Sequence, residues 1–165
     1  MSAEQSYQKE NEFSIGSEEE LVNAFRRRDQ KKLILPERLK YPFRVRSYMT
    51  WKEPSGAYTY LVFKLPNWDV PRGVAFKRTA STGEPTGGLC SWCHAYGSSE
   101  EIGLLSVAMS ANVSSSYLVC HDLSCIEKIE ETAMLAGKDP DKNIAELYYR
   151  MEKLFENISN YKPEN

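Results

Sequence analysis

All four cysteines of the chain fall into two tight pairs, and this pattern constrains the fold more than any other feature. Cys90 and Cys93 are separated by two residues, and Cys120 and Cys125 by four. Four cysteines in 165 residues are too few for a disulfide-rich mini-domain. The N-terminus lacks an apolar signal core and no stretch is long enough to cross a bilayer, so we expect a cytoplasmic protein with no membrane contact and with reduced thiols. Reduced, clustered cysteines indicate metal or redox chemistry.

The spacing of the pairs predicts one structural zinc ion. A short turn between Cys90 and Cys93 lets both sulfurs bind one tetrahedral ion. A predicted strand over residues 116–119 leads into Cys120. Cys125 then falls in the first turn of a predicted helix, where the helix dipole favours a thiolate. Knuckle, hairpin and helix in this order are typical of a treble-clef zinc finger. Four thiolates leave no open coordination position, so the zinc is expected to be structural.

Other interpretations of the cysteines explain less of the sequence. The run from Cys90 to His94 fits the Cys-x-x-Cys-His pattern of haem attachment, but haem attachment requires export and leaves Cys120 and Cys125 without a role. A redox dithiol normally opens a helix, whereas residues 95–99 resemble a loop. Four unligated cysteines would require two tight pairs by chance. His94 and His121 adjoin cysteines, but four thiols already complete a zinc shell.

The remaining patterns predict an α+β fold, with a small antiparallel sheet and a treble-clef finger flanked by one N-terminal and two C-terminal helices. Polar residues 1–16 are predicted to be a flexible tail, and residues 17–165 a single domain. Ser17 and Glu20 form a capping box that starts the first helix. Strands are predicted at 43–50, 57–64, 72–78, 104–109 and 116–119, and helices from 122 to about 136 and from 140 onward.

Three segments carry a family resemblance: Leu89–His94, Leu104–Ala108 and Tyr117–Cys125. In these segments the chain resembles the elongation-factor-G-binding proteins, the family of the bacterial fusidic-acid-resistance proteins, in their C-terminal treble-clef zinc domain. The resemblance implies that the four cysteines bind zinc, that elongation factor G is the partner, and that binding promotes release of the factor from the ribosome. Proteins of that family carry an N-terminal helical bundle, whereas the residues before position 40 of this chain provide about one helix. We therefore expect a free-standing, monomeric relative of the zinc domain.

The knuckle is the predicted contact with the partner. Trp92 lies between the first two cysteines, where it either projects outward as an aromatic anchor or packs on the final helix. With His94 and Tyr96 it forms the candidate partner-binding group.

Two further patterns concern the class of function. The sequence has no evident Ser/His/Asp or Cys/His arrangement and no phosphate-binding glycine loop, so we expect no enzymatic activity. Residues 17–50 hold nine lysines or arginines against five acidic residues. The alternative function is therefore an RNA- or ribosome-binding zinc module that uses the basic segment 26–46.

Overall fold

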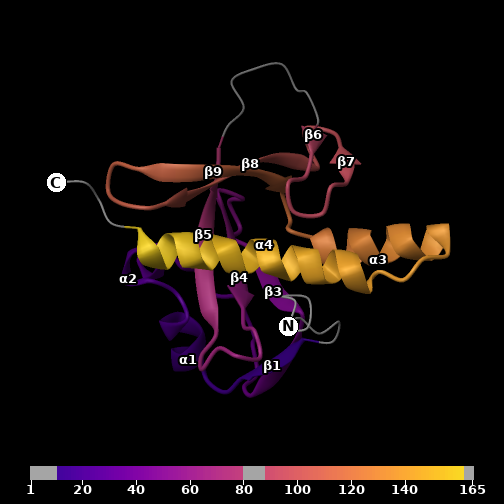
Figure 1. Ribbon diagram of the computed structural model, residues 1–165. Coiled ribbons are helices and arrows are strands. Elements are labelled where there is room, and N and C mark those ends of the chain that lie inside the picture. The colour runs from indigo at the N-terminus through magenta and orange to yellow at the C-terminus, as the bar shows by residue number, and fades with distance from the viewer. Residues whose placement is uncertain (1–10, 80–87, 162–165) are drawn as a thin grey trace. The chain divides into compact units, whose positions relative to one another are not determined.

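A computed structural model describes residues 11–79 and 88–161 of the chain. These residues form two compact units, one over 11–77 and the other from 78 onward. Both combine helices with antiparallel strands, so the predicted α+β fold is confirmed (Figure 1). In the described part of the chain, no helix is long and apolar enough to cross a membrane.

The N-terminal unit contains two short helices and two antiparallel groups of strands. β1 pairs with β2, while β3, β4 and β5 follow one another as neighbours in an antiparallel meander. The bounds are β1 (Glu12–Ile15), α1 (Glu18–Asn23), α2 (Arg27–Gln30), β2 (Phe43–Arg46), β3 (Tyr48–Lys52), β4 (Tyr58–Phe63) and β5 (Arg72–Arg78). The strand predicted over 43–50 is split in two because Ser47 adopts a left-handed conformation, with φ 67°.

The core of this unit lies where the segment that follows α1 packs against the meander of β3, β4 and β5. The amide of Gly73 donates to the carbonyl of Ala24 at 2.8 Å, and the Phe25 ring lies so close to Gly73 that an added Cβ would meet it at 2.9 Å. Phe25 also contacts the rings of Trp51 and Tyr60 edge-on. Only glycine at position 73 lets the backbone and the aromatic ring approach this closely.

The prediction of a flexible tail is wrong for its last residues. Residues 12–15 form β1, in which Phe13 and Ile15 are buried. The side-chain amide of Asn11, itself only 3% exposed, donates to the carbonyls of Ser47 and Lys64 at 3.1 and 2.7 Å. The polar sequence conceals this order because its partners lie far along the chain. Residues 1–10 lie outside the described residues, and a single domain over 17–165 stays a prediction.

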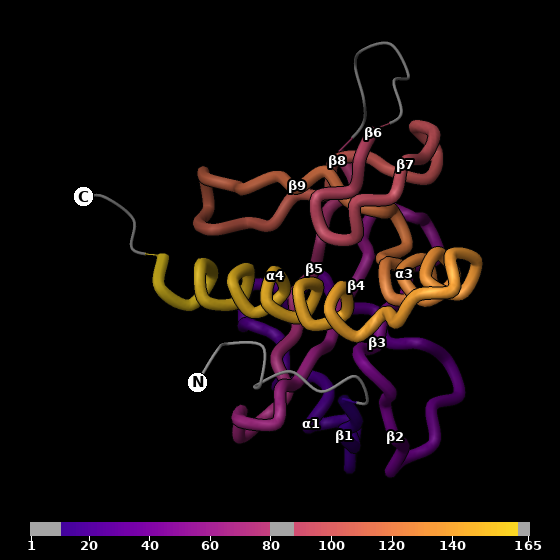
Figure 2. Tube along the Cα trace, turned by 45° about the vertical axis from the view of Figure 1, so that its right-hand side comes forward, coloured from indigo at the N-terminus to yellow at the C-terminus, as the bar shows by residue number. Residues whose placement is uncertain are grey.

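The C-terminal unit contains two hairpins and two long helices. β6 pairs with β7 and β8 with β9, both antiparallel, while α3 and α4 lie side by side (Figure 2). The bounds are β6 (Gly88–Leu89), β7 (Tyr96–Gly97), β8 (Ile102–Ala108), β9 (Ser114–Cys120), α3 (Cys125–Ala136) and α4 (Asp141–Asn160).

The two helices of this unit lie where the sequence predicts them, except that α3 begins at Cys125 rather than at residue 122, because the Asp122 carboxylate accepts hydrogen bonds from Ser124 in the turn before the helix. α3 ends at Gly137, whose φ of 65° is the left-handed C-cap that glycine adopts without strain. α4 begins after Pro140 and buries an apolar stripe at spacings of three and four residues. The buried residues are Ile144, Leu147, Tyr148, Met151, Leu154 and Phe155.

Candidate metal centre

The first cysteine pair lies in the tight turn between β6 and β7. The amide of Cys90 donates to the carbonyl of Ala95 at 2.9 Å, and the amide of His94 donates to the carbonyl of Cys90 at 2.8 Å. The amides of Trp92 and Cys93 both point at Cys90 Sγ, at 3.4 Å. His94 takes a left-handed φ of 62° to complete the turn. The backbone thus directs N–H groups towards one sulfur and brings the other alongside it.

The second pair joins the end of a strand to the start of a helix. Cys120 is the last residue of β9 and Cys125 the first of α3, as the sequence predicts. Between them, the Asp122 carboxylate accepts hydrogen bonds from the amide and hydroxyl of Ser124 at 3.0 and 2.6 Å, and Leu123 has a φ of 56°. This tight connection turns both thiols towards the knuckle.

The four sulfurs fit one tetrahedral zinc ion. All lie within 4.8 Å of one another, with Cys90 3.7 Å from Cys125 and Cys93 3.7 Å from Cys120. Zinc–sulfur bonds of about 2.3 Å in a tetrahedron require sulfurs about 3.8 Å apart. Hydrogen bonds with the Cys120 and Cys125 thiols lower the pKa of Cys90, whereas hydrogen bonds with the Cys120 and Cys90 thiols raise the pKa of Cys125. Within residues 11–79 and 88–161 no fifth ligand joins these four sulfurs, and a set of four thiolates suits a structural ion.

Neither histidine joins this group of ligands in the described residues. The His94 side chain is exposed. His121 is 7% exposed, and its Nδ1 donates to the Glu100 carbonyl at 2.9 Å. An added Cβ on Gly103 would come within 2.1 Å of His121 Nε2, so His121 fills the space that this glycine leaves. His121 thus ties the end of β9 to the residues that precede β8.

Of the two interpretations of Trp92, the structure contradicts outward projection and agrees with packing towards the final helix. Its side chain is 4% exposed, and its carbonyl accepts a hydrogen bond from Arg150 of α4 at 2.8 Å. The knuckle points its two amides at sulfur and turns the indole inward. Tyr96, by contrast, is 84% exposed, and His94 is exposed as well. The predicted role of these residues in partner binding stays a prediction.

Two cationic side chains next to the metal centre were not predicted from the sequence. Arg150 holds the knuckle backbone, and Lys128 Nζ donates to Cys120 Sγ at 3.2 Å. Lys128 follows Cys125 by three residues in α3, a spacing that puts both on one face of the helix. That spacing was the available signal for Lys128. Arg150 lies 58 residues from Trp92, so no local pattern indicated it.

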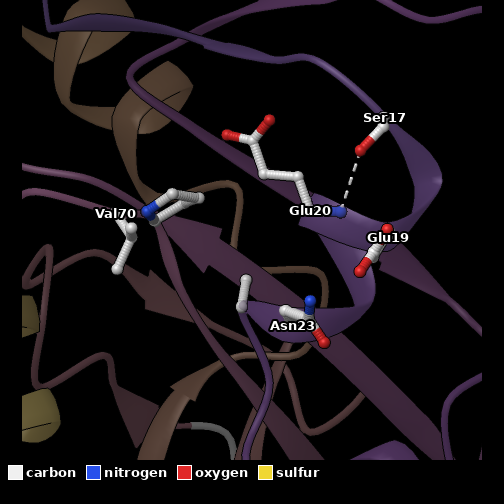
Figure 3. Close-up of a pocket in the computed structure, with 7 residues that line it drawn as sticks. Ser17, Glu19, Glu20, Asn23 and Val70 are labelled. Carbon is white, nitrogen blue, oxygen red and sulfur yellow. Dashed lines mark hydrogen bonds between the residues drawn. The ribbon is translucent and has the colours of Figure 1, made fainter.

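A separate cavity of about 360 Å³ lies in the N-terminal unit beside α1 (Figure 3). Its polar groups serve the predicted capping box: Ser17 Oγ accepts from the Glu20 amide at 3.1 Å, and the Glu20 carboxylate accepts from the Gly16 amide at 2.7 Å. The remaining lining residues are Glu19, Asn23, Ala24, Val70 and Pro71. Ser17 and Glu20 hold the start of α1, and the lining includes none of the four cysteines.

The strand, knuckle and helix around four clustered thiols define a treble-clef zinc finger. The chain matches the family described as FBP C-terminal treble-clef zinc-finger over residues 18–162, and it belongs to that family. Family and geometry together support one structural zinc ion.

Among solved structures, the chain is similar to the fusidic acid resistance protein FusC, with a TM-score of 0.51 and 19% sequence identity. The match covers 92% of this chain and 61% of that one, so this chain spans about three fifths of FusC. At this identity the likeness concerns the fold. No curated protein matches the chain.

Proposed function

We propose that this protein is a non-enzymatic, zinc-stabilised module that binds elongation factor G and promotes its release from the ribosome. The family membership and the FusC-like fold support this proposal. The partner comes from the resemblance of segments 89–94, 104–108 and 117–125 to elongation-factor-G-binding proteins.

The observation that carries the proposal is the apolar surface of the two hairpins that hold the zinc centre. Leu89 and Tyr96 are exposed cross-strand partners in β6 and β7, and Leu104 and Leu118 are exposed partners in β8 and β9. A Cβ on Gly88 would lie 3.0 Å from Leu118, so the hairpins are in contact there. Exposed apolar side chains on a rigid support mark interaction sites because they lose little entropy on docking.

Within this surface, Tyr96 takes the anchoring role that the sequence suggested for Trp92. Its ring is the most exposed of the aromatic residues on the hairpins, and it adjoins the knuckle that the metal fixes. His94 adds an exposed polar group two residues away. Trp92, by contrast, is buried inside the unit. Aromatic anchors surrounded by smaller apolar contacts are the usual core of a protein interface.

The test is a calorimetric titration of zinc-loaded full chain with purified elongation factor G. Replacing Tyr96 by Ala is expected to weaken binding by about 1–3 kcal/mol without loss of zinc. Met134→Ala is the matched control, because Met134 is 74% exposed but lies on α3, outside the hairpins. No complex with the wild-type protein at tens of micromolar would reject the partner. Unchanged affinity of folded Tyr96→Ala would reject the surface.

A second candidate, RNA binding, is favoured by the charge of segment 26–46. This segment has nine basic residues and two acidic ones. Arg26 is engaged by the Asp29 carboxylate at 3.0 and 3.2 Å, and Lys32 lies over the Tyr58 ring, but Arg27, Arg28 and Lys31 are exposed. RNA affinity carried by these cations should fall steeply with salt, measured by fluorescence anisotropy with a labelled oligonucleotide. A binding constant insensitive to salt would reject this candidate.

A further inference from the structure

Charge around the zinc centre needs compensation from the protein. Four thiolates and one Zn²⁺ carry a net charge of −2, and Cys90, Cys120 and Cys125 are fully buried. A buried charge is costly unless nearby groups hydrogen-bond to it. Cys90 receives the amides of Trp92 and Cys93, both at 3.4 Å. Cys120 receives the ammonium of Lys128 at 3.2 Å, which brings a full positive charge.

The surroundings of Lys128 direct its charge to the sulfur. Lys128 is half-buried on α3, between Ile126 and Ile129, whose buried side chains anchor that helix. Two carboxylates lie close enough to influence it, Asp122 and Glu101. Both already accept hydrogen bonds from loop residues: Asp122 from Ser124, and Glu101 from the amide and hydroxyl of Ser98. Neither forms an ion pair with Lys128 within the described residues, so the ammonium donates to sulfur.

We propose that Lys128 is the charge-compensating partner of the zinc-bound Cys120 thiolate, and that it strengthens zinc binding and slows the reaction of this sulfur with electrophiles. A hydrogen bond from a cation draws electron density from the thiolate, which lowers its nucleophilicity while the sulfur stays bound to zinc. Groups that hydrogen-bond to metal ligands orient them and tune the metal in this way. This role of Lys128 concerns the metal centre and is independent of the protein partner.

The experiment compares Lys128→Gln, which removes the charge, with Lys128→Arg, which keeps it. The full chain is loaded with zinc, and its affinity is measured by competition with a chromophoric chelator. The second readout is the rate of zinc release during alkylation by N-ethylmaleimide. Lys142→Gln is the matched control, since Lys142 is an exposed cation on α4. Removing a group that supports a metal ligand typically weakens affinity by about 10–100-fold.

The expected result is weaker zinc affinity by about tenfold or more and faster release for Lys128→Gln, with Lys128→Arg and Lys142→Gln close to wild type. Wild-type affinity and release rate in Lys128→Gln would overturn the proposal. An Arg variant as weak as the Gln variant would also overturn it, because charge would not be the cause. If Lys128→Gln folds only with excess zinc while Lys128→Arg folds normally, the proposal is supported.

Discussion

Gly103→Ala tests the packing that connects β8 to the metal centre. Gly103 lies opposite Val119 in the β8–β9 hairpin, and an added Cβ would be 2.1 Å from Nε2 of His121 and 2.9 Å from Cε1. His121 cannot move freely, because its Nδ1 donates to the Glu100 carbonyl and its amide donates to the Glu101 carbonyl at 2.8 Å. His121 also follows Cys120 directly. The substitution therefore strains the strand that delivers a zinc ligand.

The magnitude follows from the displacement of the imidazole ring. To restore even a 3.0 Å contact, the ring must retreat by 0.9 Å, the difference between 3.0 and 2.1 Å. Overpacking a core site costs about 1–3 kcal/mol. A buried polar group that loses its hydrogen bond adds about 1–3 kcal/mol. Together these contributions give an expected loss of about 2–6 kcal/mol in the free energy of unfolding, a large part of the stability of a small domain.

Urea denaturation at saturating zinc measures this loss, and His121→Ala provides the control background. Truncating His121 removes the clashing ring, so Gly103→Ala should cost less than about 1 kcal/mol in that background. A free energy of unfolding for Gly103→Ala within about 0.5 kcal/mol of wild type, or the same loss with and without His121, would show that a clash with the His121 ring is not the cause.

Three further predictions concern other contacts. Trp92→Ala should reduce the free energy of unfolding by about 3–5 kcal/mol, measured in urea, because the indole is buried; an exposed tryptophan would cost almost nothing. Asn11→Ala should cost about 1–3 kcal/mol in the same assay, since it leaves the carbonyls of Ser47 and Lys64 without this donor, whereas a tail residue would have no effect. Removing zinc with a chelator should unfold residues 88–130, and native-like amide spectra there would show that the metal is not structural.

The metal ligands were predictable because their signal is local. Pairs separated by two and four residues define a zinc knuckle and a strand-to-helix junction without knowledge of the fold. The helix boundaries at Ser17 and Gly137 follow from local capping chemistry in the same way. Features that depend only on neighbouring residues can be predicted from sequence.

Features that depend on distant partners could not be predicted. The polar segment before Gly16 becomes a strand because residues 43–46 lie beside it, and Phe13 then pairs with Val45. The indole of Trp92 points inward because of the backbone conformation of the knuckle, and the residue types in the knuckle do not determine that conformation. Gly103 is a glycine because His121 occupies the space of a side chain, a relation between facing strands. Each of these requires knowledge of the three-dimensional neighbours.

X-ray absorption at the zinc edge, combined with metal analysis of the purified full chain, measures how many sulfur atoms bind the zinc ion. We expect one zinc per chain, surrounded by four sulfur neighbours at about 2.3 Å. Replacing Cys125 by Ser should lower the sulfur count and destabilise the start of α3, because this residue opens the helix. Nitrogen or oxygen neighbours in the wild-type shell, or far less than one zinc per chain, would contradict the claim that Cys90, Cys93, Cys120 and Cys125 form a closed structural site.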